Sequence, residues 1–452
     1  MKRVLFFAYY FPPTGGAGVQ RAVKFVKYLP EFGYQCSVVA GLDSKLFVNL
    51  ELDHSLHESL NCYISRITLN RFEAFQYKIF NQTLRRYFPF AAMRWWKTSA
   101  RRALEHAVKE SKPDVIITTV SPFMSADVTA DIARKYNIPW VLDMRDPWAL
   151  DPINYYPSYL HYTSDLRNMH RACKSANAVI MNTPDSLKAL RDTFADVDQQ
   201  KTFCITNGWD DEDFVASVRN YQLADGPLKI VHTGVFHTQN ALKLDPASRK
   251  AFGVKEHRIM DCLRYSAGNP HLLARTPFYL LKSIRQLIDA EKIQKNDIKL
   301  IFAGANTSSD IEMARKFNLE DVVEFKGYLN HDDSVNLLSD SDVLFLPLHI
   351  PTKGSRNPLI VPGKVYEYMA SGKPILSLVP EGDCRNFLER YGNSFICDPA
   401  DCDSISNTIV DIVSRRKNKV LNEQMNVEFT NQFKRKELSV KLKQVLDFAI
   451  EK

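Results

Sequence analysis

VLFFAYYFPPTGGAGVQR (4–21) joins a continuous apolar run to a glycine-rich turn and then to a helical pattern. An apolar run without alternation is typical of a strand that is buried on both faces, as in parallel sheets. We therefore predict a buried strand over 4–10 and a helix over 19–32. Gly15 and Gly16 let a ligand approach the backbone, and the helix N-terminus that follows favours an anion. The spacing is not G-x-G-x-x-G, and a tight turn that simply needs glycine is the alternative.

Strand and helix patterns alternate along the rest of the chain. The strands expected in the first half are 36–40, 114–120, 138–144, 176–182 and 201–207. The strands expected in the second half are 228–236, 298–304, 322–327, 342–348, 374–379 and 394–397. Such alternation predicts an α/β protein with mostly parallel, doubly wound sheets. Because 452 residues exceed what one core usually holds, we expect two Rossmann-like domains.

The domain boundaries follow from polar stretches between these patterns. We expect an N-terminal domain over 1–220, a C-terminal domain over 221–432 and a final helical segment over 433–452. The first boundary lies beside VRNYQLADGPLK (218–229), which has the composition of a linker. The stretch 238–274 follows neither period, and we interpret it as an insertion or a mobile loop.

The composition favours a globular protein of the cytoplasm. Hydrophobic residues make up 45% and charged residues 25% of the chain. No apolar run approaches the roughly 18 to 20 residues that span a bilayer, and the first strand leads into Pro12 and Pro13 instead of a signal-peptide cleavage site. The eight cysteines are scattered without C-x-x-C pairs, so we expect neither a disulfide framework nor a metal site. The aspartates at 196–198 and 339–342 read as loop and helix-cap residues, again without a metal.

Basic and aromatic residues are concentrated at 71–112. This stretch holds ten Lys and Arg against three Glu, with large aromatic residues between them. Such a composition is typical of a surface that contacts anionic lipid headgroups, so we expect peripheral association with the inner face of the cytoplasmic membrane. The alternative is a set of helices whose aromatic residues are core and whose charges face solvent. No nucleic-acid-binding module is recognised, and we expect no nucleic-acid partner.

Three charged residues follow the strand expected at 138–144. VLDMRDPW (141–148) places Asp143, Arg145 and Asp146 at the carboxyl end of that strand. In open α/β sheets this edge is where ligands bind, so these residues are candidates for a site. A structural cluster of ion pairs is the alternative.

Two further candidates lie at element ends in the second half. HTGVF (232–236) places Gly234 at the end of a strand. RTP (275–277) precedes a helical pattern, so Arg275 could lie beside an anion at the helix N-terminus.

SRNPLIVPGKVYEYMASGKPI (355–375) contains a third candidate site in this half. Gly363 opens a short helix, where a diphosphate could take backbone N–H groups and the charge of Lys364 or Arg356. Glu367, one turn later, could accept hydrogen bonds from two ribose hydroxyls, because both carboxylate oxygens are acceptors. The alternative is a surface helix with ordinary Lys and Glu.

Seven segments of the chain occur in an order that identifies a family. They are FPPTGGAGVQR (11–21), SPF (121–123), DMRDPW (143–148), TNGWDDEDF (206–214), HTGVF (232–236), FKGYLNHDD (325–333) and PGKVYEYMASGKP (362–374). The chain resembles glycosyltransferase family 4 over nearly its whole length, outside about 45–100 and 238–274. The most similar members build bacterial capsule, O-antigen and exopolysaccharide.

The resemblance implies the GT-B fold, in which two Rossmann-like domains face a cleft and the final helix crosses back to the N-terminal domain. It implies retaining transfer from a nucleotide diphospho-sugar, with no required metal and no other cofactor. The implied donor residues are Gly15 and Gly16 for the phosphates or sugar, Arg275 and Lys282 or Lys364 for the diphosphate, Glu367 for the ribose, and Tyr328 and Leu329 for the base. Asp143, Arg145 and Asp146 would line the acceptor side.

One position departs from the family pattern. Many members carry two glutamates eight positions apart, and the earlier position here is Leu359. The glutamate usually assigned to the hydroxyls of the donor sugar is therefore absent.

The function expected from the residues and the resemblance is sugar transfer. We expect a UDP-sugar donor and a lipid-linked saccharide acceptor in the synthesis of a cell-surface polysaccharide. The alternatives are a sugar-nucleotide 2-epimerase of the same architecture and an inactive scaffold that only binds a sugar nucleotide.

Overall fold

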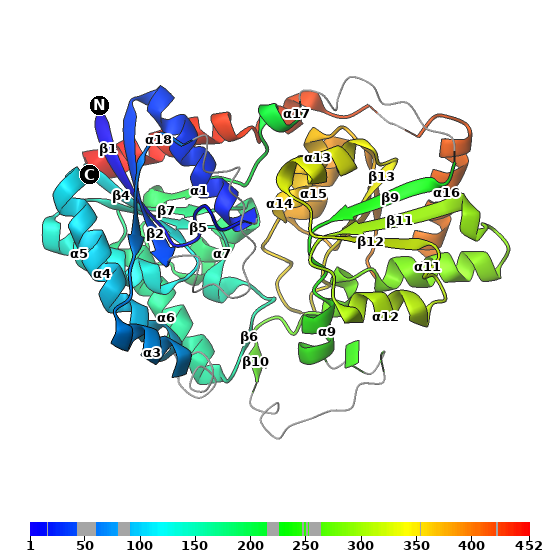
Figure 1. Ribbon diagram of the computed structural model, residues 1–452, viewed down its shortest axis with the longest axis horizontal. Helices are drawn as coiled ribbons and strands as arrows, with labels where there is room; N and C mark the ends of the chain where they lie inside the picture. The colour runs from blue at the N-terminus through cyan, green and yellow to red at the C-terminus, as the bar shows by residue number, and fades with distance from the viewer. Residues whose placement is uncertain are drawn as a thin grey trace.

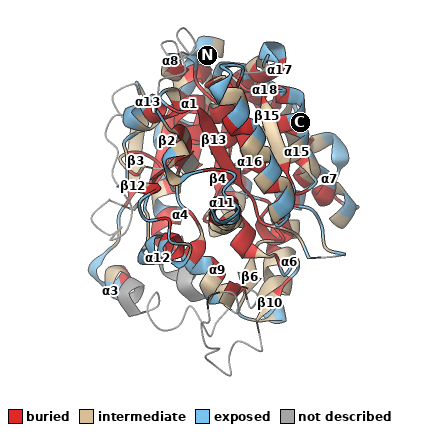
Figure 2. Cartoon of the chain, turned by 90° about the vertical axis from the view of Figure 1, so that its right-hand side faces the viewer, coloured by how far each residue is buried: buried red, intermediate tan, exposed pale blue. Residues whose placement is uncertain are grey.

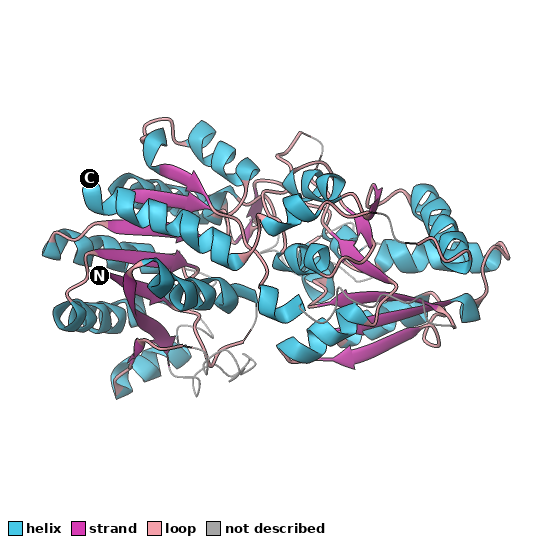
Figure 3. Cartoon of the chain, turned by 90° about the horizontal axis from the view of Figure 1, so that it is seen from above, coloured by secondary structure: helices cyan, strands magenta, loops and turns pink. Residues whose placement is uncertain are grey.

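The computed structural model describes residues 1–15, 17–42, 60–79, 91–214, 226–245, 248–249, 252, 264–352, 354–421 and 424–452. Two α/β domains lie side by side, and each has a parallel sheet with helices on both faces (Figures 1 and 3). This arrangement confirms the predicted fold class.

The N-terminal sheet contains, in the described residues, seven parallel strands in the order β3-β2-β1-β4-β5-β7-β8. These strands are β1 (Lys2–Ala8), β2 (Tyr34–Leu42), β3 (Tyr63–Ile67), β4 (Val115–Val120), β5 (Trp140–Met144), β7 (Ala178–Met181) and β8 (Thr202–Cys204). The helices of this half are α1 (Ala17–Tyr28), α3 (Arg71–Ile79), α4 (Ala91–Ser111), α5 (Met124–Tyr136), α6 (Tyr159–Ser175), α7 (Pro184–Thr193) and α8 (Asp211–Phe214). All residues of β4 and β5 are buried, because helices cover both faces of the sheet.

The C-terminal sheet contains six parallel strands in the described residues, in the order β12-β11-β9-β13-β14-β15. These strands are β9 (Leu228–Thr233), β11 (Ile298–Ala303), β12 (Val323–Gly327), β13 (Val343–Pro347), β14 (Ile375–Leu378) and β15 (Ser394–Cys397). The helices are α9 (Thr238–Leu244), α11 (Phe278–Asp289), α12 (Ser308–Lys316), α13 (His331–Ser339), α14 (Gly363–Ala370), α15 (Asp383–Tyr391), α16 (Cys402–Lys417), α17 (Val427–Asn431) and α18 (Arg435–Glu451). Figure 2 shows buried strands such as β13 enclosed by helices with exposed outer faces.

Some element boundaries differ from the expected ones. The strand expected at 228–236 ends at Thr233, because the chain turns at Gly234 with a φ of 109°. Strand β3 was not predicted; it lies at the sheet edge with Tyr63 59% exposed, so it lacks a continuous apolar run. The expected boundary at 220 and 221 lies outside the described residues.

The last helix crosses back to the N-terminal domain, as the resemblance implied. Leu442 and Leu446 of α18 are fully buried in the core that β1 and α1 form. The returning chain is fixed by backbone bonds: Trp209 N–H donates to the Phe433 carbonyl at 3.1 Å, and Arg435 N–H donates to the Trp209 carbonyl at 2.9 Å. Figure 1 shows this crossover above the gap between the domains.

Part of the unplaced stretch 238–274 forms a second link between the domains. Strand β10 (Tyr265–Ser266) pairs antiparallel with β6 (Tyr155–Tyr156) of the N-terminal half, below the gap in Figure 1. We call residues 264–275 the strap. The Tyr155 hydroxyl also donates to the Pro270 carbonyl at 3.4 Å. Residues 246–247, 250–251 and 253–263 of the stretch lie outside the described residues.

A third link joins the first turns of α7 and α15. The Asp185 N–H donates to an oxygen of Asp383 at 2.6 Å, and the Asp383 N–H donates to an oxygen of Asp185 at 3.0 Å. Each carboxylate therefore satisfies a free N–H group at the start of the opposite helix.

The strap leaves no room for a side chain at Gly268, where a Cβ would lie 2.5 Å from both the carbonyl oxygen and the Cβ of Pro152. We predict that Gly268→Val separates β10 from β6 and raises the rate of proteolytic cleavage in the strap. Ala267→Val is the matched control, because Ala267 is exposed and adjacent. Equal cleavage rates in the two variants would contradict the close contact.

Candidate functional site

A cavity of about 600 Å³ lies between the two domains. Its walls come from the carboxyl ends of strands in both sheets and from the N-terminal turns of the helices that follow. In α/β sheets this edge is the usual ligand site. The predicted residues that line it are Arg145, Asp146, Gly234, Arg275, Tyr328, Leu329, Gly363, Lys364 and Glu367.

Other predicted residues lie away from the cavity wall. Lys282 lies on α11, a helix whose apolar face packs in the core of the C-terminal domain. Arg356 is exposed and donates to the Thr193 hydroxyl at 3.0 Å. Gly15 is not a wall residue either, and Gly16 lies outside the described residues.

Among the described glycines of the first turn, Gly18 is the one that lines the cavity. A Cβ at this position would collide with the guanidinium of Arg145. Arg145 donates there to the Gly18 carbonyl, and it also donates to Val120 O at 3.3 Å and Ser121 O at 3.4 Å. We infer that Arg145 holds the first turn of α1 against the end of β4, while its guanidinium lies at the cavity wall.

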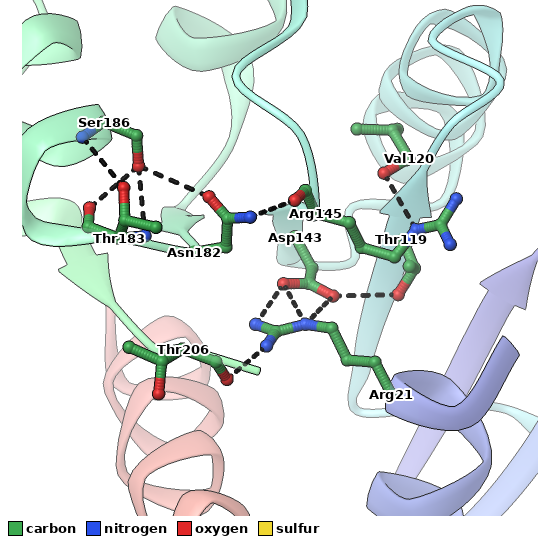
Figure 4. A network of polar contacts seen from close by, with 9 residues as sticks. All are labelled: Arg21, Thr119, Val120, Asp143, Arg145, Asn182, Thr183, Ser186 and Thr206. Atoms are coloured by element: carbon green, nitrogen blue, oxygen red, sulfur yellow. Dashed lines mark hydrogen bonds and ion pairs between the residues drawn. The ribbon is translucent and has the colours of Figure 1, made fainter. Parts of the chain in front are cut away.

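Asp143 lies beneath the N-terminal wall and is 0% exposed. Arg21 donates to its carboxylate through Nη2 at 2.8 Å and Nε at 3.1 Å, and Thr119 Oγ1 donates at 3.1 Å (Figure 4). Arg21 Nη1 donates to the Thr206 carbonyl at 2.7 Å. This buried network joins α1, β4, β5 and the segment after β8. Asp143 therefore supports the wall from below and does not reach a ligand in the cavity.

The C-terminal wall concentrates positive charge. Lys364, at the second position of α14, and Arg275, at the end of the strap, both face the cavity. Within the described residues, neither forms an ion pair with a carboxylate. Burial, and then the positive charge of Arg275, lower the pKa of Lys364 to about 7, against the opposing effect of Glu367. A wall with two half-buried positive charges is suited to an anionic ligand.

Glu367 lies one turn after Gly363 on the same helix face. Its carboxylate is 4.0 Å from Arg435 Nη2 of the crossing helix, and 21% of its side chain is exposed. Tyr328 and Leu329, after β12, line the same cavity, and Tyr328 is 44% exposed. The wall of this one cavity thus includes two cations, a carboxylate, and the Tyr328 and Leu329 side chains.

His331 is a wall residue that was not predicted. Its Nε2 lies 2.9 Å from an oxygen of Asp213 on α8, and its Nδ1 lies 3.3 Å from Gln20 Nε2 on α1. It therefore links α13 of the C-terminal domain to the N-terminal half at the cavity wall. The FKGYLNHDD segment contains this histidine, and its position at the start of a helix was the signal available in the sequence.

Leu359, which replaces the family's first glutamate, points away from the cavity. Its side chain is 4% exposed and packs in the core of the N-terminal domain. Its carbonyl accepts a hydrogen bond from Thr183 Oγ1 at 2.9 Å. The neighbouring wall residues Ile360 and Val361 are apolar.

Two family models match this chain. The model for Glycosyltransferase Family 4 matches residues 14–213, and the model for Glycosyl transferases group 1 matches residues 274–428. The chain belongs to the family 4-like glycosyltransferases. No curated protein matches the sequence.

Solved GT-B structures are similar to this glycosyltransferase over almost its full length. Sucrose-phosphate synthase from Thermosynechococcus elongatus has a TM-score of 0.65 at 15% identity, with 98% of each chain covered. Anabaena HepE, solved in complex with UDP and glucose, has a TM-score of 0.59 at 14% identity, with 99% of this chain and 100% of that chain covered. The UDP-GlcNAc 2-epimerase from Methanocaldococcus jannaschii has a TM-score of 0.54 at 11% identity, with 99% and 100% covered. At these identities the likeness shows the fold.

The His331 contact predicts pH-dependent stability. Burial acts to lower the pKa of His331, but the hydrogen bond to Asp213 and the negative charges of Asp213 and Glu367 together outweigh burial and raise the pKa. Because the pKa of His331 is raised in the folded protein, the stability that its protonated ring contributes is fully present below the unfolded pKa of 6.5. That stability is lost as the pH rises through the folded pKa. We predict that His331→Gln lowers the melting temperature more at about pH 6 than at about pH 9. An equal loss at both values would contradict the ion pair.

Proposed function

We propose that this glycosyltransferase carries out retaining transfer of a hexosyl or N-acetylhexosaminyl group from a nucleotide diphospho-sugar, with a UDP-sugar as the favoured donor. The acceptor that we propose is a lipid-linked saccharide in the synthesis of a cell-surface polysaccharide such as capsule or O-antigen. One observation carries the donor assignment: Lys364 and Glu367 lie on consecutive turns of α14 in a single cavity with Arg275.

The donor fits this wall by the chemistry of its parts. The diphosphate would lie at the N-terminus of α14, where backbone N–H groups, Lys364 and Arg275 offset its charge. The ribose hydroxyls would donate to the Glu367 carboxylate, and the base would lie against Tyr328 and Leu329.

The acceptor would enter from the N-terminal side, beside Arg145 and Asp146. As the glycosidic bond to the donor phosphate breaks, negative charge develops on the leaving diphosphate, and Lys364 and Arg275 stabilise it. Retention is consistent with attack of the acceptor hydroxyl on the same face, with its proton passing to a phosphate oxygen. Because these side chains supply the counter-charge, we propose that no metal is required.

Nucleotide binding tests the donor assignment. We expect UDP to raise the melting temperature of the protein more than GDP, CDP or ADP does, with or without EDTA, because a ligand of the native state stabilises it. Lys364→Met should weaken UDP binding by about tenfold or more, since a charge-assisted bond is lost. Lys282→Met is the matched control and should leave binding unchanged, because Lys282 does not line the cavity.

Glu367→Ala should weaken UDP binding but leave 2′,3′-dideoxy-UDP binding unchanged, because the dideoxy compound has no ribose diol. Equal losses for both nucleotides would contradict the ribose assignment. Incubation of a UDP-sugar without acceptor supplies a further test. Formation of the 2-epimer would identify an epimerase, and binding without turnover in the presence of membrane acceptors would identify an inactive scaffold.

We propose that the protein acts in the cytoplasm, on the inner face of the cytoplasmic membrane, and that α3 makes the contact. Phe72 and Phe75 lie three residues apart on α3, and they are 67% and 60% exposed. The basic residues of α4 are less available than the sequence indicated: Lys97, Arg101 and Arg102 pair with Asp127, Asp131 and Glu73, respectively. Trp96 is fully buried, and residues 80–90 lie outside the described part.

Among the described residues, no helix combines the length and the apolar character that a bilayer crossing requires. We predict that the Phe72→Ser, Phe75→Ser double variant co-sediments less with phosphatidylglycerol-containing vesicles than the unmodified protein does. Leu160→Ser is the control, because Leu160 is 73% exposed on α6. Equal losses in both variants, or no loss in either, would contradict a contact through α3.

A further inference from the structure

His232 lies behind the cationic wall, at the carboxyl end of β9, and is 2% exposed. Its Nδ1 lies 2.8 Å from the carbonyl oxygen of Phe345, and its Nε2 lies 2.9 Å from Lys364 Nζ. Both ring nitrogens therefore have a partner, one on the neighbouring strand β13 and one on helix α14.

These two partners define the tautomer of the ring. A carbonyl oxygen can only accept a hydrogen bond, so Nδ1 carries the proton. Nε2 of the neutral ring then has a free lone pair, and the Lys364 ammonium donates to it. Burial, and then the charge of Lys364, lower the pKa of His232 well below its ordinary value, which keeps the ring neutral.

The ring and the helix that carries Lys364 have further contacts. It stacks on Phe236 with a centroid distance of 4.1 Å and an interplanar angle of 15°. One turn beyond Lys364, the Tyr368 hydroxyl accepts a hydrogen bond from the Thr233 N–H at 3.0 Å. Helix α14 is therefore attached to the end of β9 at two successive turns.

The attachment places the Lys364 ammonium against the turn that follows β9. Nζ lies 2.7 Å from the position where a Cβ of Gly234 would be. The other titratable groups that act on Lys364 are Arg275 from the strap and Glu367 from its own helix. His237 also lines this part of the cavity. The Lys364 ammonium, which lies near the positive charge of Arg275, therefore has a neutral acceptor in the His232 ring.

We propose that His232 is a positioning residue for the transfer reaction, because its Nε2 accepts from Lys364 Nζ and holds the ammonium at the point of the cavity wall where the donor diphosphate binds. This inference rests on the proposed function for the identity of the ligand. The contact itself does not depend on that function, so the two can fail separately.

The first experiment follows Lys364 alone, without nucleotide. The rate of its acetylation by acetic anhydride is measured against pH by mass spectrometry in the unmodified protein, His232→Phe and His232→Gln. Phenylalanine keeps the stacked ring and removes the acceptor. The pH at which the acetylation rate is half-maximal, the midpoint, should therefore fall by about one pH unit, because the Lys364 ammonium loses its hydrogen bond. Glutamine can offer its amide oxygen near the position of Nε2 and should restore the midpoint.

The second experiment compares UDP with uridine by calorimetry. His232→Phe should weaken the binding of UDP about tenfold and leave the binding of uridine unchanged, because only UDP carries the diphosphate. In turnover assays of His232→Phe, we expect KM to rise and kcat to fall, since the ammonium acts on both the bound and the leaving diphosphate. Tyr368→Phe is the matched control, because it removes the other attachment of α14 and should not move the Lys364 midpoint.

The outcomes separate the two hypotheses. An unchanged midpoint and unchanged UDP affinity in His232→Phe would overturn the positioning role. A shifted midpoint in a protein that binds no nucleotide would support the contact and contradict the proposed donor. Should His232→Phe fail to fold, the nitrogen-15 spectrum of the selectively labelled wild type decides: an Nδ1–H tautomer supports the contact, and an Nε2–H tautomer or a charged ring at neutral pH overturns it.

Discussion

The N-terminal half of this enzyme depends on one buried ion pair, between Arg21 and Asp143. Two charges removed from water are tolerated only when further polar groups satisfy their remaining hydrogen-bonding capacity, and here Thr119 and the Thr206 carbonyl do so. The four groups come from α1, two neighbouring strands and the segment that leads to the crossover. Their separation would leave an unpaired charge in the core. The position of α1, and with it the wall at Gly18, is therefore set by electrostatics below the cavity.

In the C-terminal half, the positive charges at the cavity are arranged differently. Lys364 and Arg275 are kept close together, and in the described residues neither meets a carboxylate as a partner. Such an arrangement destabilises the free protein locally, and an anionic ligand would relieve it. A neutral histidine, a helix N-terminus and a glycine without a Cβ collect at the same point. The two halves therefore differ: the charges of Arg21 and Asp143 beneath the N-terminal wall are paired with each other, whereas Lys364 and Arg275 in the C-terminal wall have no carboxylate partner among the described residues.

Local sequence patterns predicted the parallel strands and the cavity residues at their carboxyl ends, because a buried strand needs a continuous apolar run and its end turns toward the cleft. Glu367 and Lys364 were found in this way, since their spacing on a short helix is a local property. Lys282 lies away from the cavity because helix spacing does not reveal which face of a helix meets the core, and Arg356 lies away because its loop places it beside Thr193 of the N-terminal half. Asp143 looked like a site residue, but a partner 122 positions away buries it. His232, His331 and the strap depend on contacts between distant segments, which one sequence does not display.

The strap restricts how the two domains can move relative to each other. The halves are anchored at three places, which are the crossover at one end of the domain boundary, the β6–β10 pair at the other (Figure 1), and the paired bonds between Asp185 and Asp383. A change in the relative orientation of the domains therefore has to be accommodated at all three anchors. The lower anchor consists of main-chain bonds in a segment that ends at Arg275. One short piece of backbone thus connects the lower anchor to a cation of the cavity wall.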